Sequence, residues 1–196
     1  MTKTTKDIKD LKPAGDERAF LGEEFLTWLW WRADTGNAEF ELSFHTAKSN
    51  GTAAKRTIGI VIEPPLLFRS PQEDADGKRP EQLLRFGQPL RGAEAAAGLR
   101  AGKKLVRAKL TIGDGARDWS LTFDAETFSL KSVRVPEPDA TEDSGDRVLE
   151  YVAGFDELIQ IFDQLFRLFL AQRLSGTFKD KEFAQMKSWA RAKAAG

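Results

Sequence analysis

The sequence contains no cysteine and only one histidine, His45. Without cysteine the chain has no disulfide, no zinc ribbon and no thiol nucleophile, a composition that suits a reducing compartment. A single imidazole excludes metal sites with two or more histidine ligands, and any catalytic triad would have to use His45. Because His45 continues an alternating strand pattern, we interpret it as a solvated position. We therefore predict no histidine-based catalytic residue and no histidine metal ligand.

Two further features are missing. The chain has neither a glycine–lysine phosphate loop nor a dinucleotide fingerprint, so no cofactor is expected. Its longest apolar stretch, residues 155–170, carries Asp156, Glu157, Asp163 and Arg167, which is too polar for a membrane span. Residues 1–12 lack the apolar segment of a secretion signal. We expect a cytoplasmic protein that does not contact a membrane.

What is present is enough for a folded core. The 196 residues are 41% hydrophobic and include 14 Phe and 5 Trp, and a chain of this size buries roughly 70% of its unfolded surface. We predict a flexible lead over residues 1–15, followed by a single domain over 16–196. The tryptophans Trp28, Trp30 and Trp31 could stack on bases, but Trp28 and Trp31 lie at helical spacing, which favours core or subunit contacts.

The hydrophobic pattern changes period along the chain. Apolar residues recur at helical spacing up to Gly36, and then alternate with polar residues in several short segments. We expect strands at 39–45, 58–62, 83–86, 103–112, 119–123 and 128–133, the second ending at Pro64-Pro65, with an Ala-rich helical turn or two at 93–99. A polar loop at 135–147 precedes helices at 148–170 and 179–193. The predicted fold is α+β, an antiparallel β-meander flanked by an N-terminal amphipathic helix and two C-terminal helices.

Charge is balanced overall but separated along the chain. Lys plus Arg and Asp plus Glu both number 30, yet residues 78–118 hold ten basic and four acidic side chains. Residues 173–196 hold six basic and two acidic ones, whereas residues 136–163 hold nine acidic and one basic. Such blocks are usually solvated faces, but a segregated basic patch can also hold a phosphate backbone.

The strand predicted at 103–112 would place several of these basic side chains on one side of the sheet. In strict alternation Lys103, Leu105, Arg107 and Lys109 share one side, and three cations on one face have no packing role. We predict that Lys103, Lys104, Arg107 and Lys109 contact DNA phosphates, and that Arg85, Arg91 and Arg100 extend the patch.

Two stretches resemble the recombination-associated protein RdgC family. The first is the run Phe20-Leu21-Gly22-Glu23-Glu24-Phe25-Leu26-Thr27-Trp28-Leu29-Trp30. The second begins Ala101-Gly102-Lys103, alternates through Val106 to Leu110, and returns as Trp119-Ser120-Leu121-Thr122-Phe123. The order and spacing match over roughly residues 20–190 and correspond to the C-terminal half of longer family members, without their N-terminal half.

The resemblance implies a function as well as a fold. Family members are non-enzymatic, ring-shaped homodimers that bind double-stranded DNA without sequence preference and restrain recombinase loading. It also implies that Lys103 and Arg107 face the DNA, and it adds Gln88 as a polar contact. We therefore expect a nucleoid-associated, sequence-independent DNA-binding protein that forms a homodimer and modulates recombination or replication.

Two alternatives remain open from the residues. One is a protein–protein module or accessory subunit, in which the Phe-rich helix or the acidic loop docks a partner. It predicts an exposed apolar patch of several hundred Å². The other is a metal-dependent nuclease, which predicts at least two carboxylates close together in a cleft.

Overall fold

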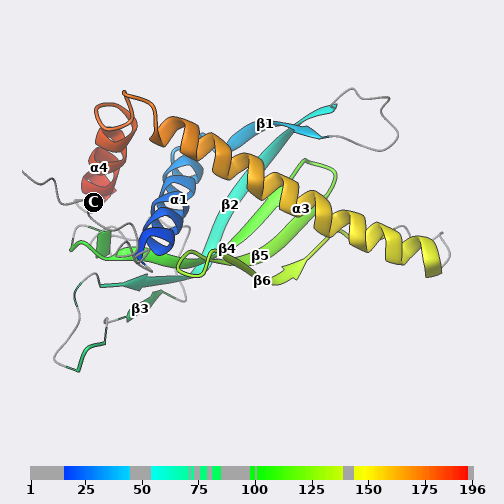
Figure 1. The fold of residues 1–196 in the computed structure, drawn as a ribbon, viewed down its shortest axis with the longest axis horizontal. Helices are drawn as coiled ribbons and strands as arrows, with labels where there is room; N and C mark the ends of the chain where they lie inside the picture. Colours follow the sequence, from blue (N-terminus) through cyan, green and yellow to red (C-terminus); the bar gives the residue numbers. More distant parts are fainter. Residues whose placement is uncertain are drawn as a thin grey trace, which may run out of the picture.

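The structure, a computed structural model, describes residues 16–44, 54–70, 72, 76–78, 81–84, 98–99, 101–138 and 144–193. These residues form the predicted α+β fold, with an antiparallel sheet and helices before and after it (Figure 1). His45, the predicted lead 1–15 and most of the predicted helical turns at 93–99 lie outside the described residues. The elements are α1 (Asp16–Asp34), β1 (Glu39–Phe44), β2 (Ala54–Arg69), β3 (Glu81–Leu84), β4 (Lys104–Gly113), β5 (Asp118–Asp124), β6 (Ser129–Arg134), α3 (Ser144–Arg173) and α4 (Glu182–Lys193).

One long strand, β2, organises the sheet. The strand order is β1-β2-β4-β5-β6. β1 pairs with the first part of β2, from Ala54 to Gly59, while β3 pairs with its last part, from Leu66 to Arg69. β4 pairs with β2 from Gly59 onward and β5 and β6 follow it, so the second half of the sheet is the predicted meander.

The prediction that Pro64-Pro65 ends the second strand is wrong. β2 continues to Arg69, and its pairing with β4 shifts register between Glu63 and Leu66. Proline has no N–H to donate to a ladder, so within a sheet it is tolerated at an irregular position of this kind. The two prolines therefore interrupt the pairing locally without ending the strand.

The helices cover one face of the sheet (Figure 1). The buried apolar side chains of the strands and helices form one core cluster. α1 packs against β2 and β4, and contacts both α3 and α4. At the centre, the ring of Phe25 on α1 lies against Phe123 of β5 and against Phe162 and Phe169 of α3. Trp28 and Trp30 are fully buried and Trp31 nearly so, as expected for core residues.

Three indole N–H groups connect elements that are distant in sequence. Trp28 donates to Gln172 Oε1 at 3.1 Å, and Trp119 donates to the carbonyl of Gly154 at 3.0 Å. Trp189 of α4 donates to Asp34 at the end of α1, at 2.7 Å. Because a buried indole N–H needs an acceptor, these bonds fix where α3 and α4 sit on the core.

The last two helices differ from their predicted limits. α3 begins at Ser144, inside the predicted loop, and runs to Arg173, while α4 begins at Glu182. Within the described part of the chain, no helix is both long enough and apolar enough to cross a membrane.

Candidate nucleic-acid interface

The face of the sheet opposite the helices carries the polar residues of the strands. On β4 these include Arg107 and Lys109, whose neighbours Ala108 and Leu110 are buried on the helix side. On β6 they include Lys131, paired across the sheet with Thr122, and Arg134, paired with Ser120. We call Arg107, Lys109, Lys131 and Arg134 the cation cluster. No described helix covers this face.

Strict alternation fails at the start of β4. The prediction placed Leu105 on the side of Arg107, but Leu105 is fully buried in the core. Arg107 is paired with Leu67 and Leu105 with Phe68, so Val106 is an extra residue in β4. A β-bulge of this kind changes the side on which the preceding residues lie. Arg107 and Lys109 therefore share the open face, while Leu105 faces the helices.

A second bulge brings Lys131 and Arg134 together. Residues three apart in a regular strand face opposite sides of the sheet. In β6 the register shifts between the partners Thr122 and Ser120, and Ser132 has a φ of 50°. The extra residue leaves both cations on the open face. The apolar pattern of Phe128, Leu130 and Val133 favours the other face for both cations, and the bulge in the pairing with β5 is what allows it.

Asp124, at the end of β5, joins two members of the cluster. Its side chain is 3% exposed, and its Oδ2 accepts hydrogen bonds from Arg107 Nη2 at 2.8 Å and Lys131 Nζ at 2.6 Å. Its Oδ1 accepts the backbone N–H of Thr127 at 3.3 Å. Burial by itself would raise the pKa of Asp124. The hydrogen bonds from Lys131, Arg107 and Thr127, with the attraction of Arg107, outweigh burial and hold that pKa well below its usual range.

The remaining β4 cation is also paired. Lys109 Nζ lies 2.6 Å from Glu63 Oε2 on β2, and both side chains are about 40% exposed, at 44% and 39%. The cation cluster thus contains four basic side chains beside two carboxylates, Asp124 and Glu63. It keeps an excess of positive charge, although the pairing reduces it below what the sequence alone predicts.

The other predicted DNA contacts lie elsewhere. Lys103 precedes β4 and is half-buried, with its N–H donating to the carbonyl of Gly98 at 3.0 Å. Lys104 lines a pocket of about 210 Å³ on the helix side, together with Glu23, Glu24 and Phe183. Four of the predicted contacts fall outside the described residues: Arg85, Gln88, Arg91 and Arg100.

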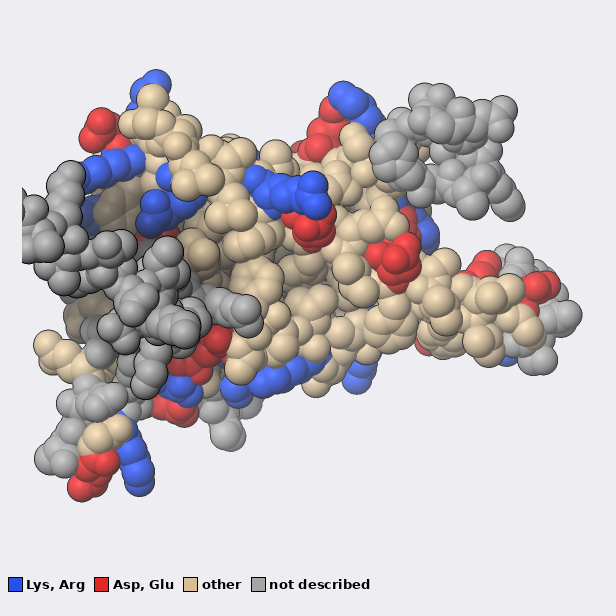
Figure 2. Space-filling model, in the orientation of Figure 1, with Lys and Arg blue, Asp and Glu red and all other residues tan. Residues whose placement is uncertain are grey.

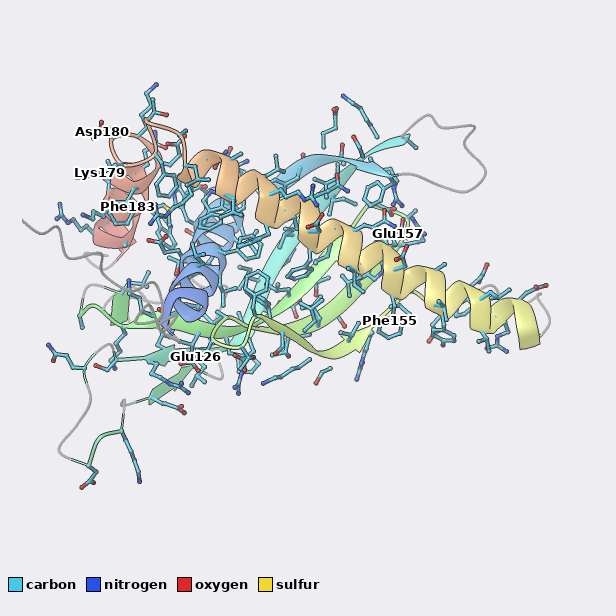
Figure 3. All side chains as sticks on the ribbon, in the orientation of Figure 1. Glu126, Phe155, Glu157, Lys179, Asp180 and Phe183 are labelled. Carbon is cyan, nitrogen blue, oxygen red and sulfur yellow. The ribbon has the colours of Figure 1, made fainter. Side chains whose placement is uncertain are left out.

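A second basic surface lies at the α4 end of the molecule. Lys179, Lys181, Lys187 and Arg191 are all exposed there. Figure 3 labels Lys179 beside Asp180 in the turn that leads into α4. Lys187 Nζ lies 4.4 Å from the centre of the Phe183 ring, so this cation is partly engaged by its own helix.

No metal site is evident in the part of the chain that the structure describes, where no group of three or more His, Asp or Glu side chains could hold an ion. A scan against protein-family models found no match to this chain. A search of curated proteins and a search of solved structures likewise found none.

Proposed function

We propose that this protein is a non-catalytic, sequence-independent binder of double-stranded DNA that modulates recombination or replication at the nucleoid. The observation that carries the proposal is the pairing of Arg107 and Lys131 with one buried carboxylate, on the sheet face that none of the described helices covers. Because one Asp124 serves two cations, the pair keeps a net positive charge. The resemblance of two stretches to the RdgC family supports the same function.

The ion pairs do not prevent phosphate binding. Arg107, Lys109 and Lys131 have side chains that are 41%, 44% and 47% exposed, so their charged ends reach solvent. The exposed pair of Lys109 and Glu63 contributes only about 0–1 kcal/mol, and an arginine has five N–H donors, of which Asp124 accepts two. A phosphate can therefore be bound by the remaining donors, or can replace Glu63 beside Lys109.

The arrangement of the cation cluster favours contact with the phosphate backbone of DNA over contact with the bases. Lys109, Thr122 and Lys131 form a row across β4, β5 and β6. Neighbouring strands are about 4.8 Å apart, so the two lysines are separated by about 10 Å along the row. The short side chain of Thr122 lies between them, and all the members of the cluster stand on strands of the sheet. Such contacts hold phosphates without reading sequence.

The proposal is tested by fluorescence anisotropy with two random duplexes of unrelated sequence, at about 50 and 200 mM salt. We expect equal affinity for both duplexes and a steep loss with salt. In the double variant Arg107→Gln, Lys131→Gln the affinity should fall about tenfold, and the log–log salt slope should become shallower by about 2, since each lost phosphate contact contributes about 0.9. The variant Glu63→Gln should strengthen binding two- to threefold, because it removes the carboxylate that competes for Lys109.

The matched control removes two positive charges from the helix side, with Arg167→Gln and Lys181→Gln, both at exposed positions. It should leave the salt slope nearly unchanged. If the control reduces the slope as much as Arg107→Gln, Lys131→Gln does, DNA contacts a different surface. If wild-type protein does not bind either duplex at the lower salt concentration, the proposed function is wrong.

A further inference from the structure

The first half of α3 projects past the sheet and exposes apolar side chains. The helix has 30 residues, and its N-terminal end extends beyond the strands (Figure 1). We call residues 144–159 the arm. Further along the helix, Ile161, Leu165 and Phe169 are fully buried in the core. The arm is therefore the part of α3 that the sheet and the other described helices leave largely accessible.

The arm is held in a fixed direction. Trp119 donates to the carbonyl of Gly154 at 3.0 Å, and Glu157 accepts a hydrogen bond from Arg117 at 2.9 Å. Arg117 also pairs with Asp114, in the turn between β4 and β5. These contacts attach the arm to the sheet. A partner therefore meets a helix that is already ordered, which lowers the entropic cost of binding.

Four exposed apolar residues form a stripe along the arm. They are separated by four, three and four positions, and they are exposed to the following fractions: Val148 61%, Val152 60%, Phe155 44% and Ile159 61%. Apolar residues at alternating steps of three and four are the pattern by which one helix packs on another. Leu149 and Tyr151 are also exposed, but they lie on either side of the stripe. None of the described helices covers the stripe, so it can accept a helix from another molecule.

The two flanks of the stripe differ. In a helix pair, the residues beside the seam face the flanks of the partner helix and select it by charge. On one flank Leu158 and Leu165 are buried in the core. On the other flank Asp156 and Asp163, which are seven positions apart, are both exposed. A partner helix therefore lies on the flank that carries the aspartates.

This accessible flank is acidic. Asp156 accepts a hydrogen bond from Gln160 at 2.7 Å, which brings no compensating charge, while Asp163 is paired with Arg167 at 2.8 Å. Arg147, the one basic residue of the arm, is nine positions from Asp156 and therefore lies on the opposite side of the helix. Figure 2 shows the visible side of the arm as mostly uncharged, with acidic atoms among the uncharged ones. Asp156 is therefore the charge that a partner on the stripe meets.

We propose that the arm binds an amphipathic helix of another protein, whose apolar side chains pack on the stripe and whose lysines or arginines face Asp156. Opposite charges across an interface favour the right partner, and like charges opposed across it exclude wrong ones. A second copy of the arm, packed antiparallel, would place Asp156 of both chains on the same flank. The charge therefore favours a basic partner over the arm itself. The cation cluster lies on the other face of the sheet, so this proposal does not rest on the proposed function.

The probe is a designed peptide of about 20 residues, long enough to form a helix when bound. It has leucine at alternating steps of three and four, lysine at the flanking positions, and alanine or glutamine elsewhere. A second peptide replaces every lysine with glutamate and keeps the leucines. Fluorescence anisotropy at low salt, with the full chain at up to a hundred micromolar, should show binding of the lysine peptide. Binding of the glutamate peptide should be at least tenfold weaker.

Two variants locate the binding on the arm. Val152→Gln, Ile159→Gln removes apolar surface from the stripe without adding charge, and should weaken binding of the lysine peptide at least tenfold. Both positions are exposed, so the far-ultraviolet circular dichroism and melting curve should not change. Asp156→Lys keeps the stripe intact and should reverse the preference between the two peptides. The matched controls change exposed residues elsewhere and should leave both affinities unchanged: Leu174→Gln, just after α3, and Asp180→Lys, before α4.

Several results would overturn the proposal. One is equal affinity for the two peptides, and another is no binding of the lysine peptide. A Val152→Gln, Ile159→Gln variant that binds the lysine peptide as the wild type does would also overturn it. Light scattering tests the other occupant: a wild-type dimer that this variant converts to a monomer would show that a second copy covers the stripe, against the proposal. None of these measurements uses DNA, so their outcome does not depend on the proposed function.

Discussion

Replacement of Gly22 by alanine is expected to lower the free energy of unfolding by about 2–3 kcal/mol, the upper part of the range for overpacking a core. Gly22 lies on α1, where an added Cβ would be 2.0 Å from the carbonyl oxygen of Ala125 and 2.9 Å from its carbonyl carbon. Ala125 is fully buried, and its N–H donates to the carbonyl of Val106 at 2.8 Å. The added Cβ would therefore clash with the backbone of a hydrogen-bonded residue, and α1 would have to move away from it.

The sign of this effect distinguishes tertiary contact from helix propensity. Alanine is favoured over glycine in an open helix by about 1 kcal/mol, so propensity alone predicts that Gly22→Ala stabilises the protein. The measurement is urea unfolding followed by tryptophan fluorescence. The control is Gly176→Ala in the turn after α3, where an added Cβ meets nothing within 4 Å, and its stability should stay near that of the wild type. A Gly22→Ala protein as stable as the wild type would contradict the close approach of α1 to the β5–β6 turn.

Replacement of Asp124 by asparagine is expected to lower the free energy of unfolding at neutral pH by at least as much as Gly22→Ala does. Removing one partner of a buried ion pair costs about 3–5 kcal/mol, and here the lost carboxylate serves both Arg107 and Lys131. The amide of asparagine also places N–H donors beside two cations. The control is Asp163→Asn, whose carboxylate is 53% exposed and pairs with Arg167 on α3, and it should cost about 0.5 kcal/mol or less.

The pH dependence of this loss follows from the direction of the pKa shift. Folding lowers the pKa of Asp124, so the ionised carboxylate contributes stability above the unfolded value of about 3.9. That contribution declines as the pH falls below about 5 and continues to decline towards the lower pKa of the folded state. Urea unfolding at pH 7 and at pH 3.5 should therefore show a smaller difference between wild type and Asp124→Asn at the lower pH. An equal difference at both values would mean that Asp124 is not ionised in its pair.

Several elements are predictable from the sequence because their pattern is local. Phe40, Leu42 and Phe44 alternate with polar residues, and the strand β1 buries them in alternation. The helical spacing in residues 148–170 likewise predicts α3, and its exact limits depend only on capping and fraying at the ends. The close contact of Gly22 with Ala125 cannot be predicted from the sequence, because it depends on how α1 packs on the sheet.

The candidate site is less predictable because it depends on the pairing of strands. Alternation assigns a face to each residue of a strand only while the strand is regular. The extra residue Val106 turns Leu105 into the core, and the shift at Ser132 brings Lys131 and Arg134 to the same face. Asp124 is one of 30 acidic residues in the sequence, and only the sheet places it between Arg107 and Lys131.

The sequence by itself determined the class of most segments and the total charge, because both follow from the order and kind of residues along the chain. The tertiary structure alone decided which of two identical patterns on α3 is buried. The apolar spacing at 148–159 matches that at 162–169, yet the sheet and α1 cover only the second. Burial depends on what lies opposite a helix face, and residues distant in the sequence supply that surface.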